Sequence, residues 1–173
     1  MNPARLTLAE INSLSREKFV RIFGGLFEHS PWIAETTWAK RPFASFEKLH
    51  ETFCQNVLNA TEEKQLMLIR AHPDLVGRAA LAGTLTREST NEQAGAGLNQ
   101  LTPEEIETFT KSNAAYREKF GFPFVICARL NKKDAILNGF RIRLNHSREQ
   151  EIRDALEEIF KIAELRLRDL THD

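Results

Sequence analysis

The segment AHPDL, Ala71 to Leu75, contains the first side chain whose type and position could do chemistry, His72. Pro73 disfavours helical geometry in the residue before it, so the sequence predicts a helix that ends at or just before His72. The negative end of a helix dipole favours a protonated imidazole, and an imidazole that is protonated near neutral pH can act as a general acid. A histidine that only caps the last helix carbonyls is the simpler interpretation of the same spacing.

A second candidate is the pattern SxxEQ, formed by Ser89, Glu92 and Gln93. Positions i, i+3 and i+4 share one face of a helix, so a hydroxyl, a carboxylate and an amide would line up on one polar stripe. Gly95 and Gly97 follow, and each glycine costs a helix on the order of 1 kcal/mol relative to alanine. They predict the close approach of another helix or of a ligand. A solvated polar face on a frayed helix is the alternative.

A third candidate is FGFPFVICAR, residues 120–129, an apolar run that is bent by Gly121 and Pro123. Its main-chain N–H and C=O groups could bind a planar heterocycle in a buried pocket. The part FPFVICARL also resembles a strand, although one strand forms no sheet. An ordinary connection that crosses the core is the alternative.

The fourth candidate is Arg166, in the C-terminal segment ELRLRDL. Its neighbours Leu165 and Leu167 are apolar, so the arginine could turn inward and bind a carboxylate through two parallel N–H groups. The alternative is a surface salt bridge with Glu164, Asp169 or another acid.

These residues need helices to position them, and most of the chain has the apolar spacing of amphipathic helices. Side chains that can cap a helix N-terminus precede the helical segments at Ser15, Ser45, Thr61, Asp74, Thr86 (or Thr84), Thr102 and Ser147. TPEE at 102–105 and SREQ at 147–150 have the capping-box pattern, and Gly83 and Gly121 are expected to end helices. The sequence therefore predicts an all-α fold, a compact single-domain bundle of about seven or eight helices over residues 1–173.

Composition excludes several classes of function. The 173 residues include 24 Lys and Arg and 24 Asp and Glu, and a net charge of zero argues against nucleic-acid or anionic-membrane binding. No window approaches the roughly 18 apolar residues of a membrane span, and no targeting signal is found. Neither a metal-binding motif nor a phosphate loop is present. Cys54 and Cys127 are expected to be buried and reduced, so we expect a cytoplasmic protein.

Taken in order, AHPDLVG, STNEQAGAGL and KFGFPFVICAR resemble the 2-oxo-4-hydroxy-4-carboxy-5-ureidoimidazoline (OHCU) decarboxylase family. FGGLFEHSPWIAE resembles the opening helix of that family, and the resemblance runs from about Ser15 to Leu170. It implies an all-helical, cofactor-free homodimer that converts OHCU, a small ureidoimidazoline, to (S)-allantoin and carbon dioxide in the last step of urate degradation.

The resemblance also assigns residues. It implies that His72 is the catalytic histidine, that Glu92 contacts the substrate and that Pro73 shapes the site. From the chemistry of decarboxylation we expect both His72 and Glu92 to be catalytic, with His72 transferring the proton and Glu92 orienting it or sharing protons with it. The remaining substrate contacts are the side chains of Ser89 and Gln93, the main chain at Phe124, Val125 and Ile126, and the guanidinium of Arg166, with Arg168 as its rival.

Two other functions remain open at this point. One is a metal-dependent hydrolase that uses His29, His50, His72 and Asp74. The other is a non-catalytic helical interaction module, in which exposed apolar faces and the more irregular segment expected between Pro31 and Pro42 would bind a partner.

Overall fold

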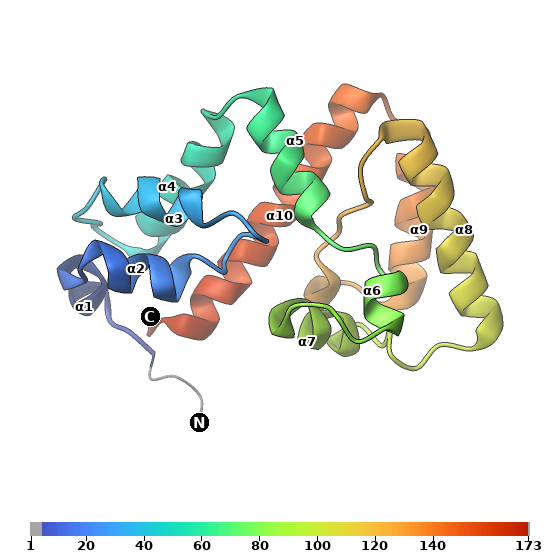
Figure 1. Ribbon diagram of the computed structural model, residues 1–173, viewed down its shortest axis with the longest axis horizontal. Coiled ribbons are helices and arrows are strands. Elements are labelled where there is room, and N and C mark those ends of the chain that lie inside the picture. Colours follow the sequence, from blue (N-terminus) through green and yellow to red (C-terminus); the bar gives the residue numbers. More distant parts are fainter. Residues whose placement is uncertain (1–4, 173) are drawn as a thin grey trace. The chain divides into compact units, whose positions relative to one another are not determined.

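The computed structural model describes residues 5–172, without the side chains of Arg78 and Ala79. Within that range the chain forms ten α-helices and one short 3-10 helix, η1 (Figure 1). Their bounds are α1 Leu8–Ser13, α2 Arg16–Phe23, α3 Pro31–Trp38, α4 Phe46–Leu58, α5 Glu62–Ala71, α6 Arg78–Leu81, α7 Arg87–Gly95, α8 Pro103–Phe120, η1 Ala128–Leu130, α9 Lys133–Arg143 and α10 Arg148–Leu170. Residues 5–172 contain no strand, only an isolated bridge between Leu6 and Thr171, so the all-α prediction is confirmed.

Most predicted helix starts are confirmed by their hydrogen bonds. A hydroxyl before the helix accepts a hydrogen bond from the backbone N–H three residues later at Ser15, Ser45, Thr61, Thr86, Thr102 and Ser147. Thr102 and Glu105 complete the predicted capping box. At the other end of α8, Gly121 adopts a left-handed conformation with φ 78° and ends the helix as predicted.

Three helices were not predicted. α3 begins at Pro31, in the segment expected to be irregular, because a proline at the first helical position loses no hydrogen bond. α1 is only six residues long, too short for an apolar periodicity, although Thr7 and Glu10 form its capping box. α9 follows Lys132, which makes no side-chain cap, so its start carries no local signal.

Three other expectations were wrong. The short helix α6 begins at Arg78, and the Asp74 carboxylate binds Arg117 instead of capping it. The Gln150 amide donates to Asp154, so SREQ forms only half of a capping box. The strand-like run has no regular structure up to Cys127, because no second strand lies beside it to pair with it.

The chain divides into two compact units. Unit 1 takes the residues up to Leu68 and those from Phe160 onward. In it, α2 packs against α3 and α3 against α4. Its core is a cluster of phenylalanine rings with centroid separations of 4.8 to 6.4 Å, made of Phe19, Phe23, Phe27, Phe43 and Phe53.

Unit 2 comprises Ile69–Ile159. In it, α8 packs against α9 and α7 against η1. Phe124 stacks on Phe140 of α9 at 3.9 Å and meets the Tyr116 ring of α8 edge-on at 5.2 Å. A β-carbon at Gly139 would lie 3.2 Å from the Phe124 ring, so this helical glycine makes room for it. The rings thereby fix the non-helical segment after Gly121.

No helix among the described residues is both long and apolar enough to cross a membrane.

Gly121→Ala should destabilise the protein by about 1–2 kcal/mol, because a β-carbon is strained at a left-handed φ. Nothing lies within 4 Å of the added methyl group, so the cost would be conformational. Gly25→Ala is the matched control, since its β-carbon also meets nothing within 4 Å and its φ is not positive. Urea unfolding measures both free energies, and equal values for the two variants would contradict the prediction.

Candidate active site

His72 lies where the sequence predicts, directly after the last residue of α5. Its backbone N–H donates to the carbonyl of Ile69 at 3.2 Å, and Pro73 prevents the helix from continuing. Only 6% of the residue is exposed. His72 therefore does not extend into bulk water.

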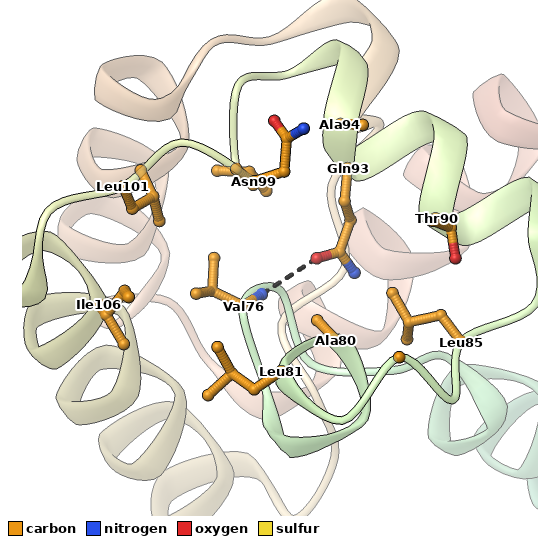
Figure 2. Close-up of a pocket in the computed structure, with 12 residues that line it drawn as sticks. Val76, Ala80, Leu81, Leu85, Thr90, Gln93, Ala94, Asn99, Leu101 and Ile106 are labelled. Carbon is orange, nitrogen blue, oxygen red and sulfur yellow. Dashed lines mark hydrogen bonds between the residues drawn. The ribbon is translucent and has the colours of Figure 1, made fainter.

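Ser89, Glu92 and Gln93 all lie on α7, which confirms the predicted helix. Ser89 and Gln93 are buried and Glu92 is half-buried, so this stripe is not an ordinary solvated face. The Gln93 Oε1 accepts a hydrogen bond of 3.1 Å from the Val76 N–H, as Figure 2 shows. This bond ties α7 to the loop that follows His72.

Of the two reasons predicted for the glycines after this stripe, the close approach of another helix is wrong. Gly97 adopts a φ of 81°, so it is needed for a left-handed turn after α7. A β-carbon on Gly95 would meet nothing within 4 Å among the described residues. Neither glycine marks the close approach of a helix.

The main chain of residues 124–127 is held by two charged side chains. Arg143 Nη1 donates to the Val125 carbonyl at 2.7 Å, and the Glu158 carboxylate accepts from the Cys127 N–H at 2.7 Å. Among the hydrogen bonds of residues 5–172, none uses the N–H or the C=O of Ile126. Polar main-chain groups in buried segments are nearly always paired, so the N–H and C=O of the half-buried Ile126 are candidates for contact with a ligand.

A buried polar network fixes this segment, and no local sequence pattern predicts that network. The Arg143 Nε donates to Glu151 at 2.9 Å, and the Tyr116 hydroxyl donates to the same Glu151 oxygen through a short bond. Glu151 is fully buried. Burial and the bond to Glu151 raise the pKa of Tyr116 far above its usual value, so the phenol stays a donor.

α7 lies close to the 124–127 segment, because it packs against η1, which follows directly. Burial raises the pKa of the Cys127 thiol, and the carboxylates of Glu158 and Glu92 raise it further. The negative charge of Glu92 therefore acts on Cys127, the residue that follows Ile126.

Arg166 and its rival Arg168 have opposite environments in unit 1. The Arg166 side chain is 6% exposed, and its Nη1 lies 3.1 Å from the Glu28 carboxylate. The same nitrogen donates to the carbonyls of Gly25 and Leu26 at 3.3 and 3.4 Å. Arg168 is 56% exposed and forms the surface pair with Glu164. The inward arginine of this helix is therefore Arg166, and Glu28 is a partner that sequence reasoning missed.

The structure thus brings most predicted site residues into one unit. Unit 2 holds His72 and Pro73, the α7 stripe and the main chain at 124–126, whereas Arg166 belongs to unit 1. The positions of loop residues Leu75 and Val76 depend on Asn113 and Gln93, two buried amides.

A pocket of about 380 Å³ lies between α7, the residues that follow α7 and the loop after His72 (Figure 2). Its walls are mainly apolar, and Gln93 is the only predicted site residue among those that line it. The lining also includes Val76, so the loop after His72 borders open space there. An apolar pocket without convergent charges does not suit a polar ureido acid.

The rival metal site gains no support. The Asp74 carboxylate is bound by Arg117 at 2.8 Å, and His50 Nε2 lies 3.0 Å from the Phe160 carbonyl. Among the described residues, the side chains with metal-ligand spacing are His146, Glu151 and Asp154, none of which belongs to that proposal.

A family model described as OHCU decarboxylase matches residues 12–168. The chain belongs to the OHCU decarboxylase family. It is 45% identical over 162 residues to the OHCU decarboxylase of Haloferax volcanii, covering 94% of each chain. It is 42% identical over 167 residues to that of Halalkalicoccus jeotgali, covering 96% of this chain and 93% of the relative.

A solved structure also has the same fold. A crystal structure of (S)-allantoin synthase superposes with a TM-score of 0.79 at 28% identity, covering 96% of this chain and 54% of that one. Membership in the OHCU decarboxylase family makes the chain an enzyme, a carboxy-lyase, and removes the non-catalytic interaction module.

Glu28→Ala should destabilise the fold by about 3–5 kcal/mol, because it leaves the buried Arg166 cation without its carboxylate partner. Glu164→Ala is the matched control, since it removes an exposed partner of Arg168 and should cost no more than about 1 kcal/mol. Urea unfolding of both variants tests this, and a Glu28 variant as stable as the control would show that the buried pair is not needed.

Proposed function

We propose that this chain decarboxylates OHCU to (S)-allantoin and carbon dioxide, with His72 as the proton-transfer residue. The observation that carries the proposal is the buried imidazole at the proline-terminated end of α5. The Gln93–Val76 hydrogen bond ties its loop to the helix that bears Ser89 and Glu92.

The chemistry needs little more than positioning and a proton. Loss of carbon dioxide leaves an electron pair, and the conjugated imine and carbonyl groups of the OHCU ring can delocalise it as an enolate-like anion. The substrate therefore serves as its own electron sink, and the protein need supply no cofactor for that purpose. It must hold one pose, stabilise the developing charge and deliver a proton to one face. The last task sets the S configuration.

Each residue then has a role. His72 transfers the proton, and Glu92 orients it or shares protons with it and accepts hydrogen bonds from substrate N–H groups. Ser89 and Gln93 bind polar atoms of the ureido group or ring. Since the Gln93 Oε1 already accepts from Val76, its amide nitrogen is the group left to face a substrate oxygen.

Main-chain groups hold the heterocycle in this proposal. Phe124 and Val125 present little side chain, because both are buried, and the Val125 carbonyl is occupied by Arg143. The N–H and C=O of Ile126 then provide a donor and an acceptor on one edge of the substrate. Pro73 shapes the opposite wall.

Arg166 anchors a carboxylate or carbonyl oxygen of the substrate. Its burial favours this role over Arg168, whose guanidinium is exposed and paired with Glu164. The contacts that Arg166 makes with Glu28 and with the Gly25 and Leu26 carbonyls hold the guanidinium in one place, and a planar guanidinium suits the two oxygens of a carboxylate.

We also infer that the enzyme is a cytoplasmic homodimer, as the family resemblance implies. Cys54 and Cys127 are both buried, free thiols, which suits a reducing compartment. Burial also raises the pKa of Cys54 to about 12, so this thiol is unreactive at neutral pH.

The direct test supplies the unstable substrate in place. Urate oxidase and hydroxyisourate hydrolase generate OHCU from urate, and circular dichroism follows allantoin formation with and without this protein. Faster formation of a single enantiomer supports the proposal, whereas an unchanged, racemic course would refute it.

His72→Asn should lower the enzymatic rate by about 10²- to 10⁴-fold, because it removes the proton donor and keeps a side chain of similar polarity. Glu92→Ala should be nearly as severe. The coupled assay measures the rate, and far-ultraviolet circular dichroism checks the fold. Normal turnover by folded His72→Asn enzyme would remove His72 from the mechanism.

Arg166→Lys should raise KM and lower kcat at least tenfold, because an ammonium group cannot reproduce the planar fork of a guanidinium. The conservative change keeps a cation beside Glu28. Arg168→Lys is the control on the exposed pair and should leave the coupled-assay kinetics unchanged. The opposite result would identify Arg168 as the substrate arginine.

A further inference from the structure

The loop that follows His72 cannot hold its own conformation. Val76 has a φ of 54°, a left-handed value that β-branched residues rarely adopt. The turn is also tight, because a β-carbon on Gly77 would lie 2.6 Å from the β-carbon of Asp74. Such a backbone persists only where its surroundings fix it.

Packing does not fix the loop on all sides. Val76 and Gln93 both line the pocket of Figure 2, so the loop borders open space there. Hydrogen bonds therefore have to supply much of the constraint.

Three polar side chains bind three consecutive loop residues. Arg117 Nε donates to both carboxylate oxygens of Asp74, at 2.8 and 3.1 Å. The other two are buried amides. Asn113 Nδ2 donates to the Leu75 carbonyl at 2.7 Å, and the Gln93 Oε1 accepts from the Val76 N–H at 3.1 Å. We call Gln93, Asn113 and Arg117 the loop clamp.

Two members of the loop clamp come from one helix face. Asn113 and Arg117 are four residues apart on α8 and so lie one turn from each other. α8 thus holds the two residues before Val76, while Gln93 of α7 holds Val76 itself. The loop is fastened to both helices immediately after the imidazole.

We propose that Asn113 and Arg117 are positioning residues for His72: through the loop clamp they fix the conformation of residues 74–76 and with it the direction in which the imidazole delivers its proton. The proposal rests on the proposed function of His72. It predicts that loosening the clamp lowers kcat and stereoselectivity more than it raises KM, because binding groups on α7 and at 124–126 stay in place.

The test compares Arg117→Ala and Asn113→Ala with Lys111→Ala. Lys111 is the matched control, because it is exposed on the same helix and pairs with Glu107, a residue outside the loop clamp. Arg117 is 43% exposed, so its variant should fold even if the buried Asn113 variant does not. Arg117→Lys keeps the charge and should restore part of the lost activity.

Four measurements are needed: hydrogen exchange of the Val76 amide, the NMR signal of the His72 ring, kcat and KM in the coupled assay, and the enantiomeric purity of allantoin. His72→Asn assigns the ring signal. We expect at least tenfold faster Val76 exchange, a shifted ring signal, at least tenfold lower kcat, less than threefold change in KM and a lower fraction of the S enantiomer. Lys111→Ala should match the wild type throughout.

A folded Arg117→Ala enzyme with wild-type kcat, enantiomeric purity and ring signal would overturn the proposal, even if its melting temperature fell. A wild-type protein that does not accelerate decarboxylation would refute the proposed function instead. In that case the exchange and ring signals still decide whether the clamp positions His72, because neither depends on turnover.

Discussion

A helix that must stop at a proline, followed by a loop that must turn through a left-handed valine, is the constraint on which the rest of unit 2 depends. A non-glycine residue in that region costs on the order of 1–3 kcal/mol and needs external support. The support comes from buried polar side chains that themselves require hydrogen-bond partners. Burying an amide is costly unless it is hydrogen-bonded, and Asn113 Nδ2 and Gln93 Oε1 both find partners in the loop backbone. The strained loop thus gains two fixed hydrogen bonds, and each buried amide gains one partner, although the Asn113 Oδ1 has none among the described residues.

In another part of unit 2 charged side chains, rather than amides, hold the backbone. Arg143 and Glu151 form a buried pair, and buried pairs seldom add stability, because desolvation offsets their attraction. What the pair provides is a fixed donor for the Val125 carbonyl and a fixed acceptor for Tyr116. A polar network of this kind holds one main-chain conformation and penalises others. Because the Val125 carbonyl and the Cys127 N–H are both bound, the direction of the Ile126 main chain between them is restricted.

Much of the helical framework could be predicted, because its signals are local. Hydroxyls before helices, a left-handed glycine after α8 and a proline after His72 act within a few residues. The partners that hold the site could not be predicted, because they are remote in sequence. Asn113 and Leu75 are 38 residues apart, and Arg166 and Glu28 are 138 apart. The SxxEQ pattern correctly indicated a helix with these three residues on it, but it could not show that Ser89 and Gln93 are buried or that Gln93 also supports a loop.

In the proposed function, the pairing of Arg166 with Glu28 changes how strongly the enzyme binds the carboxylate of its substrate. An unpaired arginine would bind the carboxylate of the substrate strongly and so oppose its departure as carbon dioxide, because only interactions stronger in the transition state accelerate a reaction. Glu28 neutralises the guanidinium at 3.1 Å. Arg166 then offers directional N–H donors without surplus charge, and it can orient the substrate while the negative charge moves from the carboxylate into the ring. In the proposed function Glu28 therefore acts together with the arginine, although no motif in the sequence links the two.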